Sequence, residues 1–257
     1  MAAPYVGFGD FPFRVASAGF GRIEKFEKFG RNPAAGTGVE DVWNGGGVYT
    51  GHPTGAAETL EIASSDTDDT AAGGGGTGAR TVQIHELLDA NGAAVADVTV
   101  SLNGQSQVSL GAGLYTRSAR MTVLTAGSGG KNAGTLTLRH TTTTANIFAV
   151  MPSGYNKTLI SAYTVPTGKV LFIDQLTASM VRSTGTAVSG SMSFRARAPG
   201  CVFESIVAPE ISQANSYEYR GPYHEFAAGT DLKWSVESTS TTSIVYAEFS
   251  GYLADTP

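Results

Sequence analysis

Histidine and cysteine are the residues of this chain with the widest choice of chemistry, as metal ligands, bases or nucleophiles. The four histidines, His52, His85, His140 and His224, are scattered, and none lies three to five residues from another histidine, a cysteine or a cluster of carboxylates. The single cysteine, Cys201, has no histidine near it in sequence, and no Gly-x-Ser-x-Gly nucleophile motif occurs. We therefore expect no catalytic residue, no metal site and no cofactor.

Two loops carry part of a ligand-binding motif. Asp66–Asp69 offers oxygen ligands to calcium, but an EF-hand loop beginning there would need glycine and glutamate where the chain has Ala71 and Thr77. Gly129–Asn132 contains a Gly-Gly-Lys run, but a Walker loop would need glycine at Thr125 and serine or threonine at Asn132. We expect both segments to be ordinary turns.

Charge and composition disfavour several classes of protein. The net charge is −5 and the isoelectric point about 5.4, the wrong sign for a protein that binds a nucleic-acid backbone. No apolar run approaches the roughly 18 residues that span a bilayer. The first residues lack the basic and apolar regions of a secretory signal, so we expect synthesis in a cytoplasm. The 33 glycines and the low charged fraction of 15% favour sheets and turns over helices.

Alternating apolar residues mark the elements on which any site must be built. The pattern recurs at Thr81–His85, Asp97–Leu102, Ser191–Arg197 and Leu232–Val236, as expected for strands with one buried face. Turn sequences such as Asn103-Gly104 separate them. We predict an all-β chain of two tandem antiparallel β-sandwiches, jelly-roll-like, preceded by an extended N-terminal arm. The predicted boundaries are 1–37 for the arm, 38–144 for the first β-sandwich and 145–257 for the second.

The predicted arm concentrates aromatic residues outside any alternating pattern. It holds six of the 12 phenylalanines, and each large apolar side chain left in water forfeits roughly 1.5–3 kcal/mol. The arm either folds over its own sandwiches or lies on a neighbouring subunit, and we favour the neighbour. The candidate partner-binding residues are Phe8, Phe11, Phe13, Phe20, Ile23, Phe26, Phe29, Arg22, Lys25, Lys28 and Arg31.

The sequence is compatible with two local structures at the end of the arm. Phe20, Ile23, Phe26 and Phe29 recur at three-residue spacing with charged residues between them, which is compatible with a short amphipathic helix. Three-residue spacing drifts around a helix of 3.6 residues per turn, so an irregular segment is an equal alternative.

Several short segments resemble a family of tailed-bacteriophage virion proteins. They are Lys28–Pro33, Val39–Trp43, Gly47–Tyr49, Ala56–Leu60, Gly78–Val82, Leu88–Asn91 and Tyr163–Lys169. The resemblance extends over most of residues 28–257. In size and β-rich build the chain is similar to capsid decoration, or cement, proteins. It implies homotrimers on the virion exterior that bind the major capsid protein and neighbouring copies, with no enzymatic motif.

Two alternative functions belong to other classes. A tail, baseplate or fibre component would recognise host surface glycans, with Tyr217, Tyr219, Tyr223 and Trp234 as a stacking platform. Trp234 shares the apolar face of its predicted strand, which favours a place in the core. A polysaccharide depolymerase would need two convergent carboxylates, and the sequence nominates no pair.

Overall fold

The computed structural model describes residues 22–256, except 75, 118–119, 183–187, 214 and 240–242. For residues 74, 222 and 223 it describes the backbone but not the side chains. Every strand pair in this part of the chain is antiparallel, and its helical structure is one 3₁₀ turn, Ala72–Gly74. The all-β prediction is confirmed. Four predicted partner-binding residues, Phe8, Phe11, Phe13 and Phe20, lie outside the described residues.

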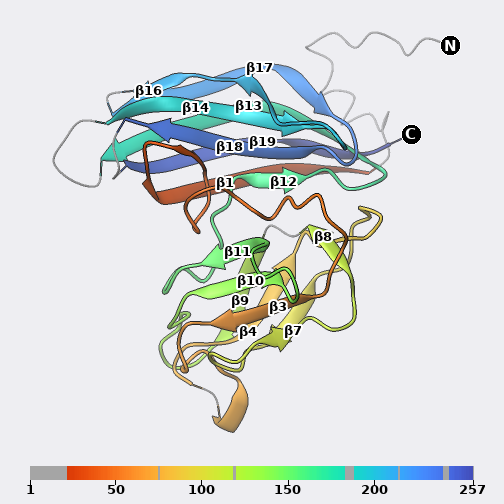
Figure 1. The fold of residues 1–257 in the computed structure, drawn as a ribbon, viewed down its shortest axis with the longest axis vertical. Helices are drawn as coiled ribbons and strands as arrows, with labels where there is room; N and C mark the ends of the chain where they lie inside the picture. Colours follow the sequence, from red (N-terminus) through yellow and green to blue (C-terminus); the bar gives the residue numbers. More distant parts are fainter. Residues whose placement is uncertain are drawn as a thin grey trace.

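The larger of two lobes, at the top of Figure 1, is built from two sheets packed face to face. The first sheet has the order β1-β19-β13-β17, with bounds Ile23–Ala35, Ser243–Asp255, Lys169–Arg182 and Ser216–Phe226. The second has the order β12-β18-β14-β15, with bounds Ala162–Thr164, Asp231–Ser238, Ser189–Arg197 and Glu204–Val207. β16 (Glu210–Ser212) pairs with β14, and β2 (Val39–Asp41) pairs with β18.

Large aromatic side chains fill the space between these two sheets. Trp234 and Phe194, from neighbouring strands of the second sheet, have ring centroids 5.6 Å apart, and Phe249 of the first sheet lies 5.2 Å from Phe194. All three side chains are completely buried. The alternation read in the sequence at Leu232–Val236 therefore identifies a core face correctly, because residues two apart in a strand share a side.

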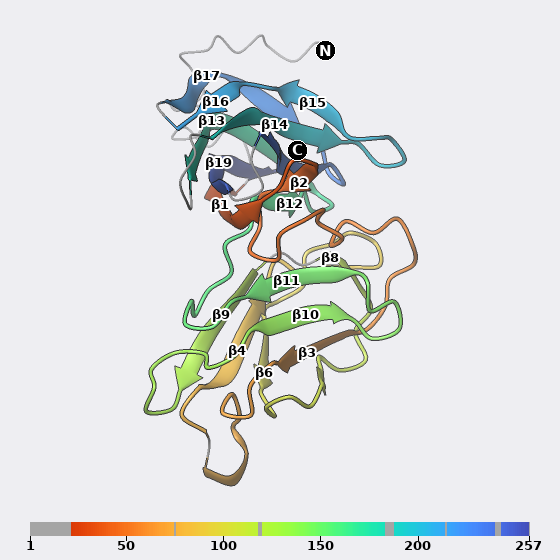
Figure 2. The same ribbon diagram turned by 60° about the vertical axis from the view of Figure 1, so that its left-hand side comes forward.

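The smaller lobe holds the remaining strands around a core of its own (Figure 2). One sheet has the order β11-β10-β3-β7, with bounds Ile147–Met151, Leu136–His140, Leu60–Ser64 and Val108–Ser109. A second has the order β6-β4-β9, with bounds Val98–Ser101, Ala79–His85 and Arg120–Ala126. A short pair joins β5 (Leu88–Asp89) to β8 (Tyr115–Arg117). The core includes Leu60, Ile62, Ile84, Met121, Leu138 and Phe148.

The two lobes are not arranged one after the other along the chain. β1 and β2 pair with β19 and β18, so the chain begins its described part in the larger lobe, leaves it after β2 and returns at β12. β11, which the predicted boundary at residue 145 assigns to the second sandwich, pairs with β10 of the smaller lobe. The tandem arrangement is therefore wrong, because alternation reveals a strand but not the partner with which it forms hydrogen bonds.

The end of the predicted arm is a strand. Residues 23–35 form β1, whose register with β19 runs from Ile23 opposite Ala254 to Asn32 opposite Val245. Both alternatives left open by the sequence, a short helix and an irregular segment, are wrong over these residues. Gly30 is required there because a Cβ atom would collide with the backbone of Ser161 and Val42.

Candidate functional site

The inner face of β1 is committed to contacts within the chain. Phe26 is buried in the larger core, with its ring centroid 4.5 Å from that of Tyr163 and 5.7 Å from that of Phe249. The prediction that Phe26 binds a partner is therefore wrong. A strand of period two turns this residue away from Phe29, which three-residue spacing had placed on the same side.

Lys28 also points inward and connects the two lobes. Its ammonium donates a hydrogen bond to Glu86 Oε2 at 2.6 Å, and only 2% of the side chain is exposed. Burial lowers the pKa of Lys28 against the opposing effect of Glu86, and the positive charges of Arg120 and Lys157 lower it further. Because Lys28 is buried in this ion pair, it is not available to a partner, and its predicted role is wrong.

The outer face of β1 and its neighbours form an exposed cluster that we call the aromatic patch, consisting of Phe29, Arg31, Tyr155 and Tyr246. Phe29 is 39% exposed, and its ring stacks on Tyr246 with centroids 6.1 Å apart. The Arg31 guanidinium lies 5.9 Å from the ring centroids of both tyrosines and donates a hydrogen bond to the Tyr155 hydroxyl at 2.8 Å. Mutual stacking holds these side chains in place while they remain accessible.

The remaining predicted residues at this end of the chain differ in exposure. Arg22 is exposed and pairs with Glu24 at 3.0 Å, and Lys25 is exposed. Ile23 is half-buried and packs on a small cluster with Val170 and Phe172. Among the described candidates, the structure therefore leaves Phe29, Arg22 and Lys25 exposed and Arg31 half-buried.

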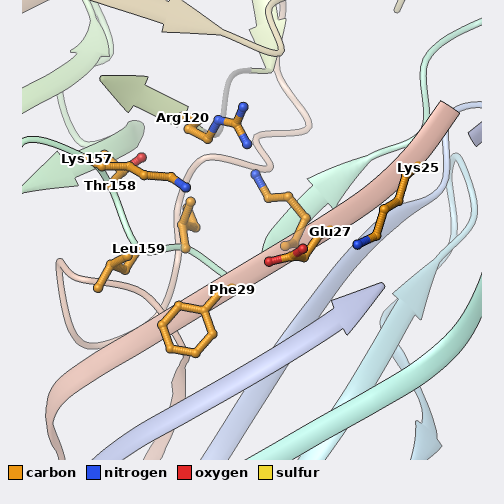
Figure 3. Close-up of a pocket in the computed structure, with 9 residues that line it drawn as sticks. Lys25, Glu27, Phe29, Arg120, Lys157, Thr158 and Leu159 are labelled. Atoms are coloured by element: carbon orange, nitrogen blue, oxygen red, sulfur yellow. The ribbon is translucent and has the colours of Figure 1, made fainter. Parts of the chain in front are cut away.

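A cavity of about 300 Å³ lies between β1 and the smaller lobe, and we call it the seam pocket (Figure 3). Its lining residues are Lys25, Glu27, Lys28, Phe29, Arg120, Lys157, Thr158, Leu159 and Ile160. Figure 3 shows Lys157 and Glu27 reaching toward the same space from opposite sides, with Arg120 beside it. Arg120 lies 3.9 Å from Glu86, the partner of Lys28. The pocket therefore gathers cations from both lobes.

Two residues that border the seam pocket have a left-handed backbone. Glu86 has a φ of 58° and Asn156, which precedes Lys157, has a φ of 56°, and no other described non-glycine residue has a positive φ. Such conformations persist where surrounding contacts enforce them, and asparagine adopts them more readily than glutamate does. The Lys28 ion pair restrains Glu86. Asn156 is restrained by two reciprocal hydrogen bonds, each of 3.0 Å, with Asn132.

A second polar cluster at the lobe boundary, the Asp231 clamp, consists of Asp231, Arg117, Arg197, Thr164 and His52. Arg117 donates Nε and Nη2 hydrogen bonds of 3.0 Å to the two Asp231 oxygens, and Arg197 Nε donates another at 3.1 Å. The Asp231 side chain is 4% exposed. Because Arg117 comes from the smaller lobe and Asp231 from the larger, the clamp fastens the lobes together.

The protonation of the clamp follows from its burial. Desolvation raises the pKa of Asp231, but His52, Arg117 and Thr164 outweigh it and hold this pKa well below the usual aspartate range. Desolvation lowers the pKa of His52 to about 3 despite the attraction of Asp231, so His52 is neutral near pH 7. The Asp231 carboxylate is thus held charged by Arg117, Arg197 and the Thr164 hydroxyl, and these contacts fasten the two lobes together.

The loops that carry partial motifs have structural roles. Asp69 is completely buried, and its carboxylate accepts hydrogen bonds from the Ser64 hydroxyl and from the backbone N–H groups of Ala79, Ala133 and Gly134. No group of three or more histidine, cysteine, aspartate or glutamate side chains within the described residues is arranged to hold a metal. Cys201 is exposed at the edge of a cavity of about 550 Å³ beside the clamp.

The sugar-stacking platform suggested by the sequence is not formed as a surface. Trp234 is completely buried, and Tyr217 and Tyr219 are partly buried against the same core. The side chain of Tyr223 lies outside the described part of the chain. Among the described residues, the exposed aromatic side chains are Phe29 and Tyr155, and both belong to the aromatic patch.

Sequence reasoning missed the residues that the tertiary structure adds to β1. Tyr155 and Tyr246 complete the aromatic patch, and Arg120 and Lys157 complete the seam pocket. No local motif marks any of them. The one sequence signal that could have found two of them is the turn sequence Pro152-Ser153-Gly154, which precedes Tyr155 and Lys157.

Comparisons with known proteins assign no family. No family model matches the chain, and no curated protein sequence matches it. The Yersinia pseudotuberculosis-derived mitogen is similar at 16% identity and a TM-score of 0.22, covering 35% of this chain and 83% of the mitogen. The infectious bursal disease virus Gt strain structure is similar at 11% identity and a TM-score of 0.21, covering 97% of this chain and 77% of that one.

These comparisons and the fold leave a limited set of conclusions. Both TM-scores are low, so neither solved structure defines the topology or the activity of this chain. Within the described residues, no helix has the length and apolar character needed to traverse a bilayer. What the structure defines is an all-β body with an aromatic patch, a cationic seam pocket and a buried clamp.

Proposed function

We propose that this chain is a non-enzymatic structural protein of a tailed-bacteriophage virion that decorates and stabilises the capsid. It binds the major capsid protein on the capsid exterior and neighbouring copies of itself, as a homotrimer. The sequence resemblance suggests this role, and the aromatic patch is the observation that carries it. The patch combines two properties of protein-binding hot spots, exposed aromatic area and an arginine that is already ordered.

The position of the patch suits a protein that attaches to a large assembly. Phe29 and Arg31 lie on β1, which pairs along ten consecutive residues with β19, so a load on the patch is carried by the sheet hydrogen bonds. Stacking fixes the side-chain rotamers before binding, which reduces the entropy lost on association. Many weak contacts of this kind bind firmly when they are repeated over a symmetric shell.

We further assign the larger lobe to the jelly-roll type. Its sheets have the orders β1-β19-β13-β17 and β12-β18-β14-β15, so successive strands from β12 to β19 alternate between the sheets, apart from β15 and β16, which both pair with β14 in the second sheet. Viral capsid and lectin domains use this architecture. The smaller lobe is then a β-sandwich inserted between β2 and β12.

Removing the aromatic patch should detach the protein from capsids. We expect the double variant Phe29→Ser/Tyr246→Ser to bind virion heads at least 30-fold more weakly, since truncating a hot-spot aromatic costs about 2 kcal/mol or more. Co-sedimentation with heads that lack the endogenous protein measures this loss. Val202→Ser, at a residue that is 75% exposed on the larger lobe, is the matched control and should bind normally.

Location on the particle provides the second test. Immunogold labelling of intact virions should cover the whole head, and label confined to the tail or one vertex would favour the glycan-binding alternative instead. A deletion of residues 1–21 tests the predicted arm separately and leaves β1 in place, whereas a longer deletion to residue 31 would remove most of that strand. Wild-type co-sedimentation by the patch variant would contradict the proposal.

A further inference from the structure

Positive charge is concentrated in the seam pocket although the protein as a whole is acidic. The pocket is lined by four cationic side chains, Lys25, Lys28, Arg120 and Lys157. Two carboxylates face them, that of Glu27 in the lining and that of Glu86 behind Lys28. Glu86 lies closest to Lys28, and Lys25 also interacts with Asp174 and Glu248, so the cations left to face the pocket are Arg120 and Lys157, in a chain whose net charge is −5.

Carboxylate groups of the chain pair closely with some of these cations and not with others. Glu86 is held by Lys28 at 2.6 Å, and it reaches Arg120 only at 3.9 Å. Lys157 takes part in no ion pair with another described residue. The Nε atom of Arg120 is buried and has no hydrogen-bond partner among the described residues. A buried donor without an acceptor costs free energy, so contacts within the described part of the chain do not fully satisfy Arg120.

Lys28 is influenced by charges from the smaller lobe as well as by its own ion pair, and Glu86 raises its pKa by more than either Arg120 or Lys157 lowers it. Arg120 and Lys157 both lower the pKa of Lys28, which shows that these two cations of the smaller lobe lie close to β1. Lys25 faces outward as well, because it also interacts with Asp174 and Glu248 on the neighbouring strands. The strongest cationic contribution to the pocket therefore comes from Arg120 and Lys157, with Lys28 behind them.

The backbone segments around Arg120 and Lys157 are held in fixed conformations. Glu86 and Asn156 have the two left-handed non-glycine conformations described above, one behind Arg120 and the other directly before Lys157. Thr158, the next residue, is fixed by accepting a hydrogen bond from the Met121 N–H at 3.0 Å. Arg120 and Lys157 are thus positioned from two segments that are tied to each other.

We propose that the seam pocket is an oxyanion-binding site, in which Arg120 and Lys157 hold a carboxylate or phosphate group against β1. Guanidinium and ammonium groups at a partly enclosed site form the strong, charge-assisted hydrogen bonds that such anions accept. The apolar walls given by Phe29, Leu159 and Ile160 limit screening by solvent. The anion comes either from an acidic side chain of a bound protein or from free phosphate, and this inference does not depend on the proposed capsid role.

Isothermal titration of the purified full-length chain at low ionic strength tests the site with two probes. The probes are inorganic phosphate and the peptide N-acetyl-Glu-Glu-Glu-amide. We expect wild-type protein to bind at least one of them, and Lys157→Gln to weaken that binding about tenfold, as loss of one charged hydrogen bond predicts. Lys157 is exposed, so this substitution leaves the core intact.

Arg139→Gln is the charge-matched control. Arg139 belongs to β10 of the smaller lobe and pairs with Glu61 at 2.8 Å, away from the pocket lining. Its loss should leave affinity unchanged. As a second readout, the bound probe should protect Lys157 from lysine acetylation, with exposed Lys131 as the internal reference.

The outcomes separate the source of the anion from the existence of the site. Tighter binding of the peptide than of phosphate identifies an acidic protein segment as the source, and the reverse order identifies free phosphate. Absence of binding by both probes would overturn the proposal, as would wild-type affinity in Lys157→Gln or equal weakening by Arg139→Gln.

Discussion

Replacing Asp231 by asparagine should lower the free energy of unfolding by about 3–5 kcal/mol. The carboxylate accepts hydrogen bonds from Arg117, Arg197 and Thr164, and it is the acidic partner of both guanidinium groups in the clamp. The amide keeps the shape but removes the charge, so two cations remain close together in a site with little water. Breaking a buried ion pair by removing one partner costs more than forming it gains.

Urea denaturation followed by far-ultraviolet circular dichroism measures this loss at neutral pH. Asp255→Asn is the control, since Asp255 pairs with Lys169 at 2.5 Å at the surface, where solvent screens the pair and the loss should be far smaller. Because the clamp joins the lobes, the Asp231→Asn transition should also separate into two steps. A single transition with unchanged midpoint would show that the clamp does not hold the lobes together.

The second large effect concerns acid stability and His52. Burial lowers the pKa of His52 from 6.5 to about 3, so between these values the unfolded chain binds a proton that the folded chain excludes. The stability contributed by neutral His52 is therefore complete above pH 6.5 and is lost as the pH falls. The slope is roughly 1.4 kcal/mol per pH unit, which amounts to about 3 kcal/mol by pH 4.5.

His52→Phe should flatten this slope. The ring of His52 packs 5.0 Å from that of Tyr49 and 5.9 Å from that of Phe203, and phenylalanine preserves these aromatic contacts without a titrating nitrogen. Urea denaturation at pH steps from 7 to 4.5 compares the two proteins. His224→Gln is the comparison variant, because burial also lowers the pKa of the less buried His224. An identical slope in wild-type and His52→Phe protein would refute this account.

The contrast between β18 and β1 shows which part of the fold can be predicted from the sequence. Alternation at Leu232–Val236 predicted a strand and placed Trp234 in the core, and both statements hold because side-chain alternation is a local property of the backbone. In β1, Phe26 and Lys28 both point inward, so the buried face of this strand carries a charged residue beside an apolar one. That mixture hid the strand, since a buried lysine is understood only when Glu86 is seen beside it.

The candidate site shows the same limit. Phe29, Arg31 and Lys25 were predicted from the sequence to bind a partner; in the structure Phe29 and Lys25 are exposed and Arg31 is half-buried. Tyr246 reaches Arg31 across a strand pair joining residues more than two hundred positions apart, and Arg120 reaches Glu86 because β9 pairs with β4 and places Arg120 opposite His85. Spacing along the chain carries no information about such neighbours.

By itself the sequence determined the all-β class, the positions of many strands and the face that several of them bury, because glycine-rich turns and period-two alternation act over a few residues. Only the tertiary structure decided that the chain leaves one sandwich and returns to it, and that cations from both lobes meet at the seam. Those outcomes depend on strand pairing and on the balance of desolvation against ion pairing, and both are set by residues distant in sequence.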